Sequence, residues 1–285
     1  MSTSKKIALV VHTCDAYEFL YKGFAYFFAK HWDFSIPCTL YFATEEKDVT
    51  IPGFQTVHSG KGEWADRLAR LLRGPIREKY ILYFQEDMWF NKDVNGAFFK
   101  GLFELAQAQG WKQVKLHSGT PYFTRPTPFT IEGFTVAKLD NETSGYLMSH
   151  QVTLWERHFL LDQLHRNEHP YRNERRGTKR LRKLNPDIYQ IDYFSDNGTL
   201  ENNQNPAPHT RSEYQSISLR GTLNDNIQPF IDELMQGNVE ERGYALRLQY
   251  HYDNKITHGG KPFKPKRDLY REVKHWIRAK LRKRR

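Results

Sequence analysis

The hydrophobic pattern of the first 120 residues alternates between two periods. Short continuous apolar runs, typical of strands buried on both faces, are followed by longer segments in which large apolar residues recur every three or four positions. This alternation predicts an α/β fold with three layers and a mainly parallel central sheet, the Rossmann-like class. The predicted strands are 7–11, 38–44, 54–58, 80–90 and 111–117, and the predicted helices are 15–32, 64–76 and 93–110.

The pattern after residue 120 is less regular. Prolines in TPYFTRPTPFT (120–130) and in EHPYRNERRGT (168–178) predict loops. Apolar spacing predicts one amphipathic helix over 150–167 and another around 225–235. The predicted strands of this half are 134–140, 145–149, 188–194 and 213–219. We therefore expect one compact unit over residues 1–262 and an appendage from 263 to 285.

The composition is that of a globular protein, with 39% hydrophobic and 27% charged residues in a chain of 285. The two cysteines, Cys14 and Cys38, form no disulfide framework or CxxC motif. No apolar stretch reaches the roughly 18 residues that a membrane span requires. These features lead us to expect a cytoplasmic protein.

Nearly all of the net charge of +10 lies in the last 22 residues. Residues 264–285 contain eleven basic and two acidic side chains, and an apolar stripe at helical spacing runs along them. A basic amphipathic helix of this kind is typical of a protein that binds the anionic inner face of the plasma membrane. A helix docked on the core and a nucleic-acid contact are the alternatives. The stripe consists of Leu269, Val273, Trp276, Ile277 and Leu281.

An acidic motif interrupts the apolar stretch YILYFQEDMWF, residues 80–90. Carboxylates in apolar surroundings are costly unless they are paired, and the apolar residues that follow argue against an ordinary exposed turn. Asp87, at the carboxyl end of a buried strand, is a candidate ligand of Mg²⁺ or Mn²⁺, with Glu86 second, because both ions prefer hard oxygen ligands. A polar strand end that faces water is the simpler reading.

Three segments together resemble bacterial glycosyltransferases of the GT-A type. LVVHTCDAYEF resembles their nucleotide-binding first strand and turn. GEWADRLARLLRGPIREKYILYFQEDMWF resembles the helix and strand that lead to their DxD-like acidic pair, with Gln85 in place of one carboxylate. HQVTLWERHFLLDQLHRNEHPYRNERRGTKRL resembles their acceptor-side helix and loop. The resemblance implies a nucleotide-sugar-binding half at 1–120 and an acceptor-side half at 121–262.

The same resemblance implies roles for particular residues. Asp87 and Glu86 would hold the metal on the donor diphosphate, whose departure develops negative charge. Other side chains would contact the nucleotide-sugar donor: Thr13, Asp15, Arg67 and Arg180. Asp15 is also a candidate helix N-cap. If the reaction inverts the anomeric centre, one carboxylate accepts the acceptor's proton, and the candidates are Glu174, Glu168 and Asp140.

The sequence therefore predicts a metal-assisted transferase that extends a surface glycan such as capsule or lipopolysaccharide. No nucleic-acid partner is expected, although a nucleic-acid-binding protein that uses its basic patches is one alternative. A sugar nucleotidyltransferase on a similar sheet is the other. The absence of GxGxxG and of GxxxxGK[ST] argues against a dinucleotide oxidoreductase and a P-loop NTPase, and no HxH or HExxH spacing supports zinc.

Overall fold

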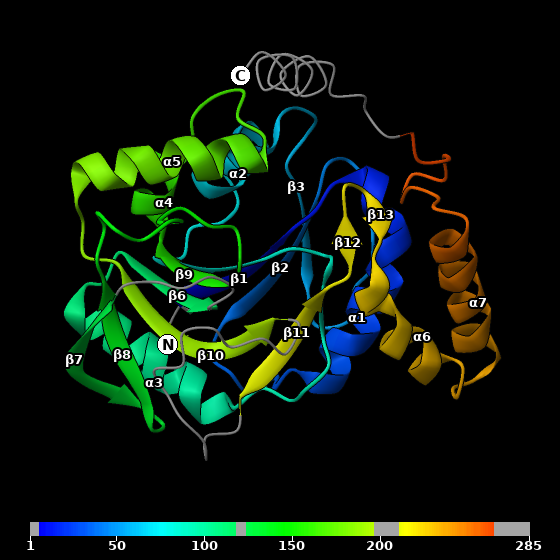
Figure 1. The fold of residues 1–285 in the computed structure, drawn as a ribbon, viewed down its shortest axis with the longest axis horizontal. Coiled ribbons are helices and arrows are strands. Elements are labelled where there is room, and N and C mark those ends of the chain that lie inside the picture. The colour runs from blue at the N-terminus through cyan, green and yellow to red at the C-terminus, as the bar shows by residue number, and fades with distance from the viewer. Residues whose placement is uncertain (1–5, 118–123, 197–210, 265–285) are drawn as a thin grey trace, which may run out of the picture.

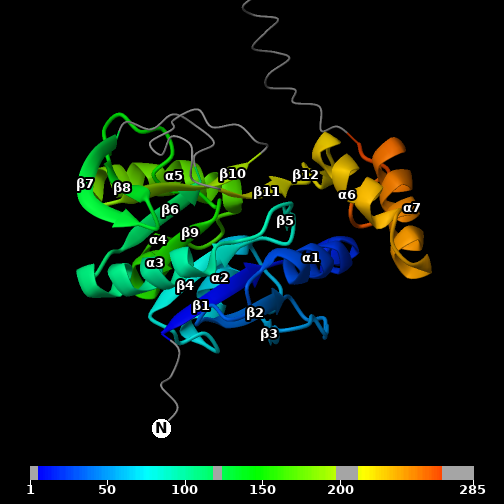
Figure 2. The same ribbon diagram turned by 90° about the horizontal axis from the view of Figure 1, so that it is seen from below.

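The computed structural model describes residues 6–117, 124–196 and 211–264, and its centre is an 11-stranded sheet. Helices cover both faces of this sheet (Figures 1 and 2). Nine strands follow one another across it in the order β3-β2-β1-β4-β9-β6-β10-β11-β5, and β8 and β7 extend from β10. The strands along this path are β3 (Gln55–His58), β2 (Thr39–Thr44), β1 (Ile7–His12), β4 (Tyr80–Phe84), β9 (Thr153–Glu156), β6 (Gln113–His117), β10 (Tyr189–Asp196), β11 (Ser212–Ser216) and β5 (Met88–Phe90).

The sheet is parallel in two blocks separated by one reversed strand. Strands β3, β2, β1 and β4 run parallel, and so do β6, β10 and β11. Between these blocks β9 is antiparallel to both β4 and β6. The predicted Rossmann-like α/β class is thus confirmed. A reversed strand at the centre was not predicted, because residues 150–167 were assigned to one helix.

Alternating side chains of β1 pack into two separate cores. Ile7, Leu9 and Val11 pack with helices α1 (Glu18–His31) and α3 (Gly96–Gln109) on one face of the sheet. Ala8 and Val10 pack on the other face with α2 (Trp64–Arg73), α4 (Arg157–Gln163) and α5 (Pro170–Leu184). A strand buried on both faces is continuously apolar, which explains why this sequence pattern predicted the strands of the first half well.

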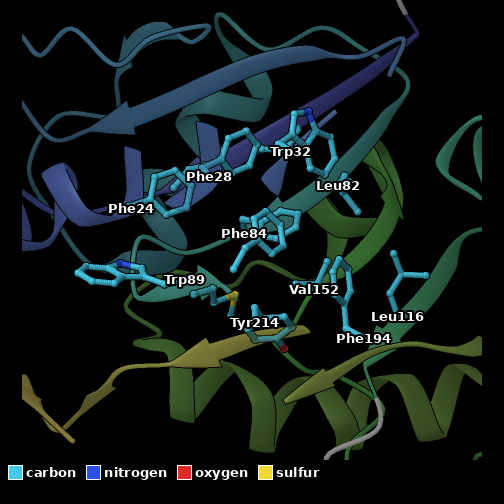
Figure 3. Packing of buried hydrophobic residues seen from close by; sticks show 14 of the residues in the cluster. Phe24, Phe28, Trp32, Leu82, Phe84, Trp89, Leu116, Val152, Phe194 and Tyr214 are labelled. Carbon is cyan, nitrogen blue, oxygen red and sulfur yellow. The ribbon is translucent and has the colours of Figure 1, made fainter. Parts of the chain in front are cut away.

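Aromatic side chains fill the larger core (Figure 3). Phe24 and Phe28 of α1, and Trp32 directly after this helix, lie above Phe84 and Trp89 from β4 and β5. The ring centroids of Phe28 and Trp32 are 5.1 Å apart. Aromatic pairs at such distances contribute roughly 0.5–1.5 kcal/mol beyond the area they bury. The aromatic packing therefore fixes α1 against the strand ends that form the cavity described below.

The region 150–167 is a strand followed by a short helix, so the prediction of one amphipathic helix was wrong. Leu154 packs into the core beneath α1, whereas Trp155 packs into the opposite core. This alternation is that of a strand with two buried faces. Glu156 ends β9, and its carboxylate caps α4 by accepting hydrogen bonds from the backbone N–H groups of His158 and Phe159.

The two loops predicted from prolines were also wrong where the structure describes them. Residues Pro170–Leu184 form α5, because proline fits the first helical turn and His169 caps it with a bond to the N–H of Arg172. Residues Thr124–Ile131 form strand β7, which pairs only with β8 (Phe134–Leu139). Proline is tolerated on such an edge strand. Residues 145–149, predicted as a strand, form no regular element.

Asp15 does not cap α1 with its side chain, contrary to the sequence prediction. Residues Asp15–Tyr17 form a 3₁₀ turn, and the Asp15 carboxylate accepts hydrogen bonds from the backbone N–H groups of Glu45 and Glu46. The backbone N–H of Asp15 in turn donates to the Glu45 carboxylate at 3.0 Å. The side chain therefore joins the loop after β1 to the loop after β2.

Two helices near the end of the described chain pack beside α1 (Figure 2). These are α6 (Gln228–Leu234) and α7 (Val239–Asp253), and the salt bridges Lys30–Glu233 and Lys22–Glu240 connect them to α1. In the part of the chain that the structure describes, no helix has the length and apolar character to cross a membrane. The basic stripe of 269–281 lies outside the described residues.

Candidate functional site

A cavity of about 540 Å³ lies where the carboxyl ends of β1 and β4 meet the start of α5. Ligands of parallel sheets bind at such ends. Four parts of the chain form its walls: the end of β1 with the first turns of α2, the β4–β5 turn, the contact between residues 150–151 and α5, and residues 216–221. The lining residues include His12, Thr13, Cys14, Tyr17, Trp64, Arg67, Gln85, Glu86, Asp87, His150, Tyr171, Glu174, Ser218 and Arg220.

The chain turns directly after β4, and this turn brings both acids of the QED motif to the cavity. Residues 85–87 form the turn, which we call the acid turn. The N–H of Met88 donates to the Gln85 carbonyl, and the indole N–H of Trp89 donates to the carbonyl of Glu86 at 3.0 Å. Because the strand has already ended, the alternation of faces expected of a continuous strand does not apply here.

The apolar residues after the acid turn anchor it. Met88–Phe90 form β5, which pairs with β11 at the far edge of the sheet. Trp89 stacks on Phe27 with ring centroids 5.3 Å apart and packs directly over Gly23 of α1, where a Cβ atom would lie 2.0 Å from the indole ring. The apolar segment Met88–Phe90 therefore holds the acid turn against α1.

Glu86 is a buried carboxylate, with 5% of its surface exposed. Burial and the neighbouring Asp87 raise the pKa of Glu86 well above its ordinary value, against the opposing influence of the Arg67 guanidinium. Such a site favours either a proton or a cation. Two adjacent carboxylates supply the hard oxygen ligands that Mg²⁺ and Mn²⁺ prefer, so the residues present fit the predicted metal. Within the described ranges, no group of three or more His, Cys, Asp and Glu side chains is placed to hold a metal by itself.

Arg67 and Thr13 lie together on the wall beside the acid turn. The guanidinium of Arg67 donates to the Thr13 carbonyl at 2.7 Å and lies 3.6 Å from the Glu45 carboxylate. It is 6% exposed, and its Nε has no hydrogen-bond partner among the residues that the structure describes. His12 is similar, since neither ring nitrogen has a partner in the described part of the chain. Buried polar atoms are normally satisfied, so these atoms point to a polar ligand.

Glu174 lines the cavity from the second turn of α5. Its carboxylate accepts a hydrogen bond from the backbone N–H of His150 at 3.0 Å. Burial raises the pKa of Glu174, although the His150 N–H and the nearby Lys115 act in the opposite direction. A carboxylate with a raised pKa is the stronger base, which suits proton abstraction near neutral pH.

The structure brings five of the predicted site residues into this cavity and leaves four outside its lining. Thr13, Arg67, Glu86, Asp87 and Glu174 line it.

The other four have different surroundings. Glu168 and Arg180 bind each other through two hydrogen bonds of 3.0 and 3.1 Å. The Asp140 carboxylate accepts hydrogen bonds from the N–H groups of Glu142 and Thr143. Asp15 lines a separate cavity of about 810 Å³ beside α7. Their predicted roles gain no support from the geometry.

Most of the other lining residues were not predicted as site residues, among them His12, Tyr17 and Arg220. His12 ends β1 and Tyr17 follows in the 3₁₀ turn, and their position after the first strand was the only signal in the sequence. Arg220 projects from the tight hairpin between β12 (Ser218–Leu219) and β13 (Thr222–Leu223), with φ +56° followed by Gly221 at φ +80°. Such short strands leave no periodicity by which the sequence could have placed this arginine.

Comparison with known proteins gives weak similarities. No protein-family model matches the chain, and no curated protein matches it. A structure of Staphylococcus aureus TarS is 12% identical over 88% of this chain, with a TM-score of 0.45, and this chain spans 43% of its length.

Two further solved structures show the same level of similarity. TarS 1–349 in complex with UDP-GlcNAc is 11% identical over 88% of this chain and 72% of that chain, with a TM-score of 0.45. UDP-glucose pyrophosphorylase complexed with UDP-glucose is 11% identical over 65% of this chain and 89% of that chain, with a TM-score of 0.40. Similarity at this level leaves the function to be inferred from the chemistry of the cavity.

Proposed function

We propose that the protein is a glycosyltransferase that moves a sugar from a nucleotide-diphosphate donor to a glycan acceptor. The observation that carries this proposal is that the acid turn and Glu174 line the same cavity. A transfer of this kind needs two chemical functions, one that stabilises the leaving diphosphate and one that accepts the acceptor's proton. The cavity offers a candidate for each.

The acid turn is suited to the donor diphosphate. Asp87, with Glu86 beside it, would hold Mn²⁺ or Mg²⁺, which when bound supplies the positive charge that stabilises the departing diphosphate. Arg67 lies close enough to Glu86 to lower its pKa and fixes the loop after β1 through the Thr13 carbonyl. Arg220, on the opposite hairpin, adds a second cationic side chain to the lining. Both arginines are suited to bind phosphate oxygens.

Glu174 is suited to the proton transfer. Its bond to the backbone of His150 fixes the position of one carboxylate oxygen, and its raised pKa increases its strength as a base. When Glu174 takes the proton of an acceptor hydroxyl, the acceptor oxygen forms a bond to the anomeric carbon of the donor sugar. The bond from that carbon to the diphosphate oxygen breaks, and the diphosphate leaves with the bonding electrons. A general base at Glu174 fits a single displacement, which inverts the anomeric centre.

A surface glycan such as capsule or lipopolysaccharide is the acceptor we propose, with the enzyme at the inner face of the plasma membrane. The basic character of 264–285 in the sequence supports this membrane location. The tail lies outside the described residues, so the membrane contact rests on sequence alone.

A thermal-shift screen of nucleotide sugars, with and without Mn²⁺, tests the donor proposal. Binding to the native state raises the unfolding midpoint by mass action, so at least one nucleotide sugar is expected to stabilise the protein, and more so with Mn²⁺. Nucleoside triphosphates serve as the control for the nucleotidyltransferase alternative. Stabilisation by triphosphates alone would favour a nucleotidyltransferase over a glycosyltransferase. No stabilisation by any nucleotide would overturn both proposed functions.

A further inference from the structure

A second hollow, of about 520 Å³, lies between α5 and residues 145–146 and is strongly basic. We call it the anion groove. Four of its seven lining residues are cationic and none is acidic. Arg175, Arg176 and Lys179 are exposed, and so is the aromatic ring of Tyr146, at 47%. The lining residues are Gly145, Tyr146, Arg175, Arg176, Thr178, Lys179 and Arg182.

Arg182 of the anion groove is fixed in place by hydrogen bonds that do not neutralise its charge. Arg182 donates from Nε to the Asn141 carbonyl and from Nη2 to the Ser144 carbonyl, both at 3.0 Å. These bonds use two of its five N–H groups and leave its charge intact. Arg176 approaches the buried Glu168 only to 3.7 Å, and Glu168 is already bound by Arg180. A preorganised cluster of guanidinium groups binds phosphate and carboxylate groups well.

The anion groove and the catalytic cavity are both lined by α5 and by the segment that packs on it, residues 144–151. Residues 144–151 pack tightly on α5, where a Cβ atom on Gly177 would lie 2.7 Å from Met148, and the N–H of Met148 donates to the Thr178 hydroxyl at 3.2 Å. At one end of this contact lie the groove residues, and at the other end the N–H of His150 donates to Glu174. A chain molecule lying along the contact would reach from the groove to the candidate base.

We propose that the anion groove binds the body of an anionic glycan acceptor, a sugar chain that carries phosphate or carboxylate groups, while its terminal hydroxyl enters the cavity at Glu174. This inference rests on the proposed transferase function and narrows its substrate class. The cations would pair with the acidic substituents, and the exposed face of Tyr146 offers an apolar surface to a sugar ring. Charge complementarity and the shared walls are the grounds for choosing this occupant.

Binding of a labelled galacturonic acid decasaccharide to the full chain, followed by fluorescence anisotropy in 150 mM NaCl, tests the proposal. The double variant R175Q/K179Q should weaken binding about tenfold, since exposed ion pairs contribute up to roughly 1 kcal/mol each. The control is K183Q, an exposed lysine of the same helix outside the groove lining. A neutral maltodextrin of equal length should bind weakly. Equal affinities of R175Q/K179Q and K183Q would overturn the proposal.

Hydrogen–deuterium exchange locates the bound glycan and separates the groove from the basic tail. Protection of residues 144–151 and 170–184 by the decasaccharide is expected, and protection confined to 264–285 would contradict it. Tighter binding of a dT10 oligonucleotide, or of anionic vesicles, through the same groove residues would assign the groove to another partner. Binding of the nucleotide sugars from the thermal-shift screen is measured on the same samples. If none of them binds, the proposed transferase function fails, whereas loss of groove binding alone removes only the glycan proposal.

Discussion

Two buried glutamates on neighbouring parts of the fold have opposite surroundings. Glu168 is 1% exposed and is satisfied by Arg180 and Asn173. Although burial raises its pKa, the hydrogen bonds from Arg180 and Asn173 hold it below the ordinary value. Glu86 is 5% exposed, and burial together with Asp87 raises its pKa well above that value. A buried acid whose partners are present stabilises the fold, whereas one that lacks full compensation marks a place for a ligand.

Replacement of Asp87 tests whether the acid turn binds a ligand, and it should have the largest effect on activity. Asp87→Asn keeps the shape but removes a metal ligand, so transfer should fall at least about a hundredfold, the range measured when one group that stabilises developing charge is lost. Release of nucleotide diphosphate from a nucleotide sugar is the measurement. Asp93→Asn, at an exposed carboxylate paired with His31, is the control. Normal turnover by Asp87→Asn would remove the acid turn from the mechanism.

Glu174→Gln should slow transfer by about a hundredfold while the nucleotide donor still binds, because the loss of a general base affects the chemical step. In the wild type, kcat should fall as the pH decreases through the pKa of Glu174, which is raised above the ordinary glutamate value. The acidic limb should therefore lie above pH 4.5, and Glu174→Gln should remove it. An unchanged pH profile in the variant would show that another group accepts the proton.

Glu168→Gln tests the satisfied glutamate and should affect stability rather than chemistry. The variant leaves Arg180 without its carboxylate partner, so the free energy of unfolding should decrease by about 2 kcal/mol, below the full range for buried pairs because Arg180 is partly exposed. Urea denaturation measures this loss. The double variant Glu168→Gln/Arg180→Gln should recover part of it. If the single variant instead lost activity at full stability, the contrast between the two glutamates would be wrong.

Glu86→Gln should produce the smallest of these effects, a gain in stability where Glu168→Gln causes a loss. The folded state raises the pKa of Glu86, so it binds a proton more tightly than the unfolded state, and stability falls as the pH rises from the unfolded pKa through the folded one. At pH 7, above the pKa that Glu86 has in the unfolded chain, this carboxyl group therefore destabilises the folded state. Its neutral replacement should raise the ligand-free unfolding midpoint by about 2–4 °C, and this gain should vanish below pH 4. Destabilisation at pH 7 would show that the native state compensates the charge.

The strands of the first half could be predicted because a strand buried on both faces needs apolar residues at successive positions, and these form a continuous apolar run in the sequence. The same rule failed at Leu154 and Trp155, since a run of four strand residues followed directly by a helix resembles one amphipathic segment. Helix α5 was missed because its proline was read as a helix breaker, although proline at the first helical position favours a helix. Local sequence cannot distinguish these cases without the neighbouring strands.

Site residues were predicted where they directly follow an element and missed where only tertiary packing places them. Asp87 follows β4, and Thr13 follows β1, so their position was visible in the pattern. Glu174 was found through the family resemblance, although the loop expected around it is a helix. Nothing in the sequence near Arg220 indicated the cavity, because a hairpin of two-residue strands carries no periodic signal. Nor could spacing show that Glu168 is already bound by Arg180, twelve residues away.

The contact between Gly23 and Trp89 couples two positions that are distant in the sequence, so that substitutions at one constrain the residues accepted at the other. Any side chain at position 23 would meet the indole ring that holds the acid turn, so the two positions are expected to change together among descendants of this sequence. Alanine at 23 should be accompanied by a smaller residue at 89. A paired change of this kind, sought in related genomes, would trace the acid turn through sequences too divergent for their acidic residues alone to be aligned.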